Sequence, residues 1–246
     1  MTNPSINSPA PSSMRPRDAA TLIVVDHTAS QPRILMGRRH PNQIFLPDKY
    51  VFPGGRSEIA DRAIPSASEL HEREIAKLLY DMKGNPSPHR ARALAMAALR
   101  ETYEETGLLI GTNETSTEDI ALPSTADPIW QAFFAEGVQP SLSALTFLAR
   151  AITPPGRPRR YDTRFFWVDA ARIAKQSSPK DDELRDLGWF TFDELRQLDI
   201  PNITRAVVED LAEHLSENND ARANWAVPYY YFKSGTFERI LVRGSS

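Results

Sequence analysis

The sequence predicts a single α+β domain built around a mixed β-sheet. Apolar, β-branched segments typical of strands alternate with helical segments, but without the regular strand–helix–strand rhythm of a parallel sheet. The strongest periodic signal is a helix over 89–106, and proline- and glycine-rich bends at 53–55 and 84–88 divide the segments before it. Of the 246 residues, 41% are hydrophobic, which is enough apolar material to bury one sizeable core.

The composition excludes several classes of function. Formal charges sum to −3, from 29 Lys and Arg against 32 Asp and Glu, so the chain lacks the basic excess typical of proteins that bind nucleic acid polymers or acidic membranes. It contains no cysteine, which excludes disulfides, zinc–thiolate sites and cysteine nucleophiles. The sequence has neither a long apolar run nor a secretory signal pattern. We therefore expect a cytoplasmic protein in which any metal is bound by oxygen or histidine.

The beginning of the chain predicts a tail followed by strands. Residues 1–18 are rich in proline and serine and hold hardly any aliphatic residue, so we expect a disordered tail before a domain over 19–246. Apolar segments over 20–25, 33–37 and 50–52 predict short strands. The third runs into Pro53-Gly54-Gly55, which predicts a tight bend.

Two helices are expected next. Apolar spacing over 66–82 predicts a helix, with Ser66 and Glu69 spaced as a capping box at its start. The helix over 89–106 carries an apolar stripe, and Gly107 stands where a helix-ending glycine is usual. The stripe consists of Ala91, Leu94, Ala95, Ala98, Leu99 and Thr102.

The second half of the chain predicts further short elements. These are a polar loop over 112–128, a helix over 129–136, strands over 145–152, 164–168 and 187–190, a capped helix beginning near 191, a helix over 202–215 and a hairpin over 229–242.

Three carboxylates gather near the end of the predicted helix over 89–106. Glu101, Glu104 and Glu105 stand at i, i+3 and i+4, within an arc of about 100° on one face. Like charges at this spacing destabilise a helix, and the last turns favour cations instead. A divalent cation would remove the conflict, and ligation by carboxylates alone favours Mg²⁺ or Mn²⁺ over zinc or copper. The alternative is a solvated acidic patch paired with neighbouring arginines.

The residues around this acidic group resemble a known motif. The segment 100–108 is similar to the second half of the Nudix box, R-E-U-x-E-E-x-G-U with U aliphatic, and Thr102 replaces a larger aliphatic residue. The segment 52–55 resembles the start of the same box. From Gly55 to Arg100 there are 45 positions where an uninterrupted box has 14, so 31 residues are inserted. The box is therefore split.

The insertion resembles one branch of the Nudix hydrolases, that of the mammalian peroxisomal acyl-CoA diphosphatase and its bacterial relatives. The lead-in over 45–55 and the segment 160–166 are similar to segments of that branch. Asp61 stands where the family carries a glutamate. The resemblance covers about 19–195 and implies a Nudix-type α/β/α sandwich with a mixed β-sheet and an insertion at 66–88.

The resemblance also implies the roles of individual residues. Arg100 is expected to orient the carboxylates. The ligands that it implies for Mg²⁺ or Mn²⁺ are the carboxylates of Glu101, Glu104 and Glu105 and the carbonyl of Gly55.

A further acidic residue is implied on a downstream loop. Glu183 stands six positions before Trp189, as a loop acid of the family does, and the alternative is a solvated loop residue. The expected chemistry is attack on phosphorus by a water that the metal acidifies and a carboxylate deprotonates. Glu101 and Glu183 are both candidates for that base, and the sequence does not choose between them.

Arginines and aromatic residues near these motifs have open roles. Arg38 and Arg39 lie at a predicted strand end before the glycine bend, where they could hold phosphate or simply be solvated. Trp130, Phe133 and Phe134, at helical spacing, are expected to pack in the core or at a dimer face.

The implied function is hydrolysis of a nucleoside diphosphate linked to another moiety, a nucleotide-type small molecule, with CoA or acyl-CoA favoured. The alternatives are an ADP-ribose or dinucleotide pyrophosphatase and a non-catalytic Nudix-like sensor, and the intact acidic ligands argue against the sensor. The helix over 66–82 and the segment 112–140 are expected to frame the pocket or a homodimer contact.

Overall fold

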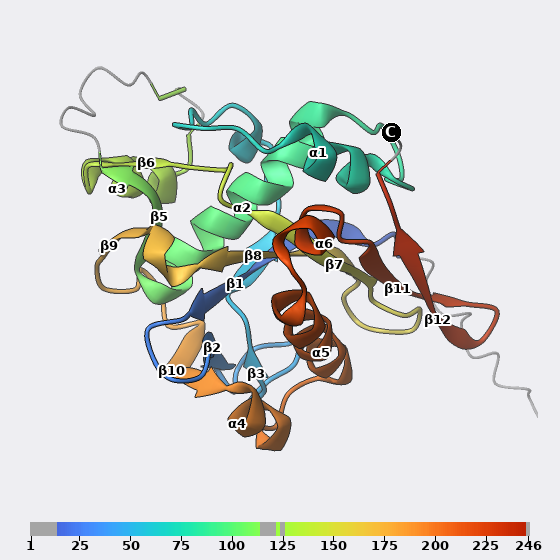
Figure 1. Cartoon of the computed structure of the whole chain (residues 1–246). Coiled ribbons are helices and arrows are strands. Elements are labelled where there is room, and N and C mark those ends of the chain that lie inside the picture. The colour runs from blue at the N-terminus through green and yellow to red at the C-terminus, as the bar shows by residue number, and fades with distance from the viewer. Residues whose placement is uncertain (1–13, 114–121, 124–125, 245–246) are drawn as a thin grey trace, which may run out of the picture.

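A mixed nine-stranded β-sheet forms the centre of the protein in the computed structural model, which describes residues 14–113, 122–123 and 126–244 (Figure 1). Its strands follow the order β10-β2-β1-β8-β7-β11-β12, with β3 paired to β2 and β4 to β1. β1 runs parallel to β8 and antiparallel to β2, so the sheet is mixed as predicted. The strands are β1 (Arg17–Asp26), β2 (Arg33–Arg39), β3 (Tyr50–Val51), β4 (Gly54–Arg56), β7 (Thr146–Ile152), β8 (Tyr161–Asp169), β10 (Leu184–Thr191), β11 (Val227–Lys233) and β12 (Thr236–Val242).

A second, three-stranded sheet lies beside the first. β5 (Leu108–Asn113) pairs with β6 (Val138–Pro140) on one edge and with β9 (Ile173–Gln176) on the other. β5 was not expected as a strand from the sequence. Of the polar loop expected over 112–128, residues 114–121 and 124–125 lie outside the described parts of the chain.

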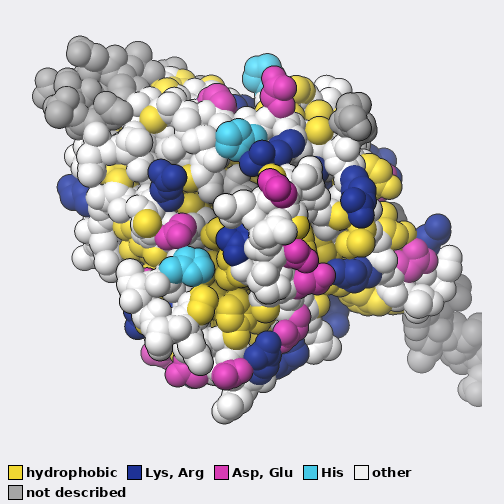
Figure 2. Space-filling model, viewed as in Figure 1, with side chains coloured by type: hydrophobic (Ala, Val, Ile, Leu, Met, Phe, Trp, Pro, Cys, Tyr) yellow, Lys and Arg dark blue, Asp and Glu magenta, His cyan; other side chains and the backbone are white. Residues whose placement is uncertain are grey.

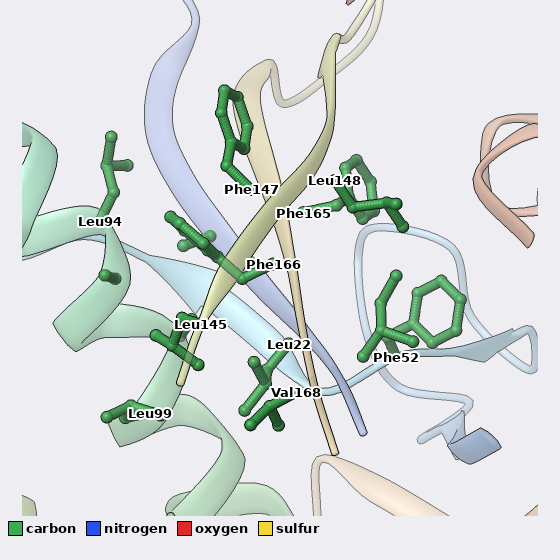
Figure 3. Close-up of a cluster of buried hydrophobic side chains, with 14 of the residues drawn as sticks. Leu22, Phe52, Leu94, Leu99, Leu145, Phe147, Leu148, Phe165, Phe166 and Val168 are labelled. Carbon is green, nitrogen blue, oxygen red and sulfur yellow. The ribbon is translucent and has the colours of Figure 1, made fainter. Parts of the chain in front are cut away.

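Helices cover both faces of the central sheet, with α1 and α2 on one side and α5 on the other (Figure 1). Leu22 and Val168 turn towards Leu99 of α2, whereas Leu148 and Phe165 lie on the opposite side of their strands (Figure 3). The predicted α+β class, with helices on both sides of a mixed sheet, is confirmed. The helices are α1 (Glu72–Leu79), α2 (Pro88–Thr106), α3 (Pro128–Ala135), α4 (Phe192–Gln197), α5 (Asn202–Ser216) and α6 (Asn219–Ala223), with short 3-10 turns η1 (Ala60–Arg62) and η2 (Ala170–Arg172).

The predicted helix over 89–106 is confirmed as α2. Ser87 caps its start, since its side chain accepts a hydrogen bond from the Arg90 amide, and Pro88 occupies the first turn. Gly107 ends it in the left-handed conformation at φ 74°. A Cβ on Gly107 would stand 2.1 Å from the carbonyl oxygen of Ser177, so the next segment packs directly on this end of the helix.

The helix expected over 66–82 is shorter than predicted. α1 begins only at Glu72, because the supposed capping pair has another use. Ser66 Oγ donates to Glu69 Oε1 at 2.6 Å, and both residues accept hydrogen bonds from the guanidinium of Arg92 on α2. The pair therefore fixes the inserted segment to α2 instead of starting a helix.

The N-terminal strand also differs from its predicted start. β1 begins at Arg17, two residues before the expected start of the domain at residue 19, and residues 1–13 lie outside the described chain. Asp18 belongs to the sheet because its carboxylate forms ion pairs with Arg90 of α2 and Arg164 of β8.

Charge on the surface follows the near-neutral composition. Acidic and basic side chains are interspersed over the face shown in Figure 2. Within the described parts of the chain, no helix combines the length and the apolar character needed to cross a membrane.

Candidate active site

The predicted acidic residues lie where the end of α2 meets the glycine bend. The amide of Gly54 donates to Glu105 Oε2 at 2.8 Å. A Cβ on Gly55 would stand 2.4 Å from Glu101 Cδ, so only a residue without a side chain fits against that carboxylate. β4 holds the bend in place by pairing with β1, opposite Ala20 and Thr21. The two halves of the split motif are therefore brought together despite the residues between them.

Burial of these carboxylates makes their negative charge costly. Burial, together with neighbouring Glu104 and Glu183, raises the pKa of Glu101 to about 7, although Arg100 opposes the shift. Glu105 is 1% exposed, and burial raises its pKa well above its ordinary value. Burial also raises the pKa of Glu104, and the negative charge of the nearby Asp181 raises it further. The positive charges near Glu101, Glu104 and Glu105 therefore do not balance the negative charge of the three carboxylates.

Arg100 reaches two of the acids from a buried position. Its Nη1 lies 3.0 Å from Glu101 Oε1 and 3.5 Å from Glu104 Oε2. Its Nη2 donates to the carbonyl of Arg56 at 2.8 Å, and its Nε donates to Asp61 Oδ1 at 3.0 Å. The guanidinium thus links the backbone after the glycine bend to the acids of α2.

Glu183, on a distant part of the chain, joins the same group. The loop before β10 packs on the end of α2, where the amide of Lys180 donates to the carbonyl of Glu104 at 2.7 Å. Glu183 Oε1 lies 2.5 Å from Arg39 Nη2. The negative charge of Glu183 adds to the raised pKa of Glu101, Glu104 and Glu105.

The two candidate phosphate-binding arginines, Arg38 and Arg39, point to opposite faces of β2, because successive side chains alternate along a strand. Arg39 faces Glu183 and the acidic group, and its Nε is buried without a hydrogen-bond partner among the described residues. Arg38 points to the other face and pairs with Asp186 at 2.8 Å, where its side chain is 45% exposed. The structure therefore brings Arg39, and not Arg38, to the site.

The aromatic residues of α3 pack in the core. Trp130 and Phe133 are fully buried, and Phe134 is 5% exposed. Trp130 also donates a hydrogen bond from Nε1 to Asp61 Oδ1 at 2.9 Å. The sequence did not predict this contact, and no local signal could have indicated it because the two residues are far apart in the chain. Asp181 and Gln43, which neighbour Glu183 and Arg39, were also not predicted; their closeness to those residues in the sequence was the available signal.

The donor chemistry of the site fits a hard divalent cation. Glu105 is fully buried, yet the hydrogen bond from Gly54 is the one its carboxylate receives within the described chain, which leaves acceptor capacity that a cation could use. As the side chains stand, no three His, Asp or Glu of the described residues converge as a ready-made metal-binding group. The carboxylates would therefore have to turn towards an ion to share it.

No family model matches the chain, and no curated protein matches it. A solved structure of a Nudix hydrolase from Alicyclobacillus acidocaldarius is 26% identical, over 80% of this chain and 91% of that one, with a TM-score of 0.59. More distant are a MutT protein from Methanosarcina mazei Go1, at 12% identity over 83% of this chain and 100% of that one with a TM-score of 0.46, and the Nudix domain of Shewanella oneidensis NrtR in complex with ADP-ribose, at 12% identity over 82% and 90% with a TM-score of 0.44. On the likeness to the Alicyclobacillus acidocaldarius structure, the chain has the Nudix hydrolase fold.

Proposed function

We propose that this protein is a Nudix hydrolase that uses Mg²⁺ or Mn²⁺ to cleave the diphosphate of a nucleoside diphosphate linked to another moiety. The observation that carries the proposal is the placement of Glu101 and Glu105, buried at the end of α2 against Gly54 and Gly55. A solvated acidic patch would leave these side chains in water with ordinary pKa values. Here burial raises the pKa of both, which is the condition that a bound cation would relieve.

In this proposal each residue of the site has its own role. Glu101, Glu104 and Glu105 hold the cation, with the carbonyl of Gly55 as a further ligand, and Arg100 orients the carboxylates. When bound, the cation neutralises the diphosphate and lowers the pKa of a water. Glu101 or Glu183 takes the proton of the attacking water.

Arg39 is proposed to contact a phosphate of the substrate. Its Nε is buried without an acceptor in the described chain, while one Nη holds Glu183. A phosphate oxygen would satisfy that free donor, and the planar guanidinium can bind two acceptors at once.

The favoured substrate class is CoA or acyl-CoA. Support comes from the split motif and from the segments 45–55 and 160–166, which resemble the acyl-CoA diphosphatase branch. A fold does not define the leaving group. ADP-ribose, NADH and diadenosine polyphosphates are therefore the competing substrates in the test.

The test is an assay of the purified protein with each of these substrates, with Mg²⁺, with Mn²⁺ and without metal. Glu104→Gln and Glu105→Gln should abolish metal-dependent hydrolysis, whereas Glu213→Gln, at an exposed position of α5, should not change it. Full activity in the Glu104→Gln and Glu105→Gln variants would show that the site is wrongly assigned. A preference for ADP-ribose over CoA would replace the substrate class and leave the reaction type unchanged.

A thermal shift with the metal alone tests binding apart from catalysis. Mn²⁺ should raise the melting temperature of the wild type and not that of Glu105→Gln, because a ligand that binds the folded state stabilises it. A wild type that neither hydrolyses any diphosphate nor responds to Mg²⁺ or Mn²⁺ would support a non-catalytic sensor instead.

A further inference from the structure

A hydrogen bond ties α3 to the buried part of the site. Trp130 Nε1 donates to Asp61 Oδ1 at 2.9 Å, and neither residue is exposed to solvent. Asp61 lies in η1, at the motif position where the family carries a glutamate and before the insertion at 66–88, and Trp130 lies on α3, beyond β5. Two elements that the sequence separates by 69 positions therefore meet at one carboxylate.

Both oxygens of the Asp61 carboxylate accept hydrogen bonds from protein donors. Oδ1 accepts from Arg100 Nε at 3.0 Å and from Trp130 Nε1, while Oδ2 accepts from the amide of Glu58 at 2.8 Å. A buried carboxylate without such donors would be strongly disfavoured, so each donor helps to hold the Asp61 side chain in place. The indole is the donor that comes from outside the motif.

The position of Asp61 determines the orientation of Arg100. Asp61 binds the Nε side of the guanidinium, and the carbonyl of Arg56 accepts from Nη2. With these contacts made, Nη1 is the part of Arg100 that is left to face Glu101 and Glu104. A guanidinium is planar and rigid, so fixing one edge aims the other.

We propose that Trp130 is a positioning residue for the active site, which acts through Asp61 to hold Arg100 against the acids of α2. Its effect on catalysis rests on the proposed function, whereas its effect on Arg100 does not. Groups that orient the ligands of a metal site commonly change metal affinity or activity about 10- to 100-fold when they are removed.

The competing explanation is that Trp130 only packs. Its ring stacks at a tilt on Phe133, with centroids 5.4 Å apart, and Phe133 meets Tyr103 of α2 edge to face. Phe133→Leu removes packing from the same cluster but no hydrogen bond, so it is the matched control for Trp130→Phe, which removes the N–H and keeps an aromatic ring.

The first test is NMR of the metal-free full chain, which needs no activity. The Nε–H of Arg100, assigned by its loss in Arg100→Lys, should exchange slowly with water in the wild type. Trp130→Phe should speed that exchange at least about tenfold, as expected for the loss of a hydrogen bond to a charged group, and Phe133→Leu should leave it within about twofold.

A second variant changes the acceptor of the Trp130–Asp61 hydrogen bond instead of its donor. Asp61→Asn should shift the indole N–H signal of Trp130 and leave that of Trp225, which donates to the carbonyl of Leu148, unchanged. The second variant keeps the proposal testable if Trp130→Phe does not fold.

The catalytic consequence is tested by Mn²⁺ affinity and by kinetics. Trp130→Phe should weaken Mn²⁺ binding or lower kcat about tenfold with little change in KM, and should add much less in an Asp61→Asn background. Unchanged Arg100 exchange, together with a loss of melting temperature equal to that of Phe133→Leu, would overturn the proposal. If the wild type binds no Mn²⁺ and hydrolyses nothing, the proposed function fails, and the NMR result still decides whether Trp130 positions Arg100.

Discussion

Glu101 lies so close to Gly55 that residue 55 has no room for a side chain. An added Cβ would stand 2.4 Å from Cδ and Oε1 of Glu101 and 2.5 Å from its Oε2. The strand β4 cannot easily retreat, because it pairs with β1, and α2 cannot, because its apolar stripe is buried in the core. The carboxylate is therefore the group that would have to move.

Gly55→Ala is expected to displace Glu101 and to remove most of the activity. Overpacking of this kind also destabilises a fold by about 1–3 kcal/mol. The control is Gly244→Ala, whose Cβ would meet its nearest atom at 3.5 Å, in Ala76. Assays at a temperature where both variants are folded separate the two effects, and wild-type kcat in Gly55→Ala would show that the contact has no role in catalysis.

Arg39→Lys and Arg38→Lys should differ although the residues are neighbours on β2. Lysine at 39 can pair with Glu183 but cannot also present the planar fork, so kcat/KM should fall about tenfold or more. Arg38 pairs with Asp186 at the surface, and its replacement should change kcat/KM by less than about twofold. Equal losses in the two variants, measured with the best substrate of the wild type, would contradict the assignment.

His214 should make stability depend on pH. It is 1% exposed, its Nε2 accepts a hydrogen bond from Trp167 Nε1 at 3.1 Å, and burial lowers its pKa to about 4, with Arg222 and Lys77 acting in the same direction. Because the unfolded chain takes up the proton near pH 6.5 and the folded chain only near 4, this contribution to stability is complete above pH 6.5 and is lost as the pH falls towards 4.

Denaturant unfolding at pH 7 and pH 5 measures this dependence. His214 should account for about 1–2 kcal/mol of lost stability between the two values. His214→Gln keeps an acceptor near the position of Nε2 but does not titrate, so it should remove that part of the loss. A variant with the same pH dependence as the wild type would show that other groups cause it.

The fold was predictable where local pattern and burial agree. The apolar stripe of α2 and its glycine end were read correctly, because a buried helix needs both. Local pattern gave the wrong start for the helix predicted over 66–82, because Ser66 and Glu69 have the spacing of a capping box but bind Arg92. Spacing alone cannot show whether a polar pair serves its own backbone or a side chain on another element.

The site was predictable only as far as its motif. The grouping of Glu101 and Glu105 with the glycine bend could be predicted because their chemistry and spacing are local to a few residues. Which of Arg38 and Arg39 faces inward depends on the register of β2 with β10, and the role of Trp130 depends on how α3 packs. Both are set by tertiary contacts that no local pattern encodes.

The two ends of α2 offer a final comparison between stability and function. Ser87→Ala removes the N-cap and should cost about 1 kcal/mol without changing kcat, because the acids lie several turns away. Gly107→Ala should cost at least as much, since φ of 74° is unfavourable for alanine and its Cβ would stand 2.1 Å from Ser177 O. That clash pushes away the segment that leads to Glu183, so kcat should fall as well. Denaturant unfolding and kinetics on both variants check this, and an unchanged kcat in Gly107→Ala would mean that Glu183 is held by Arg39 alone.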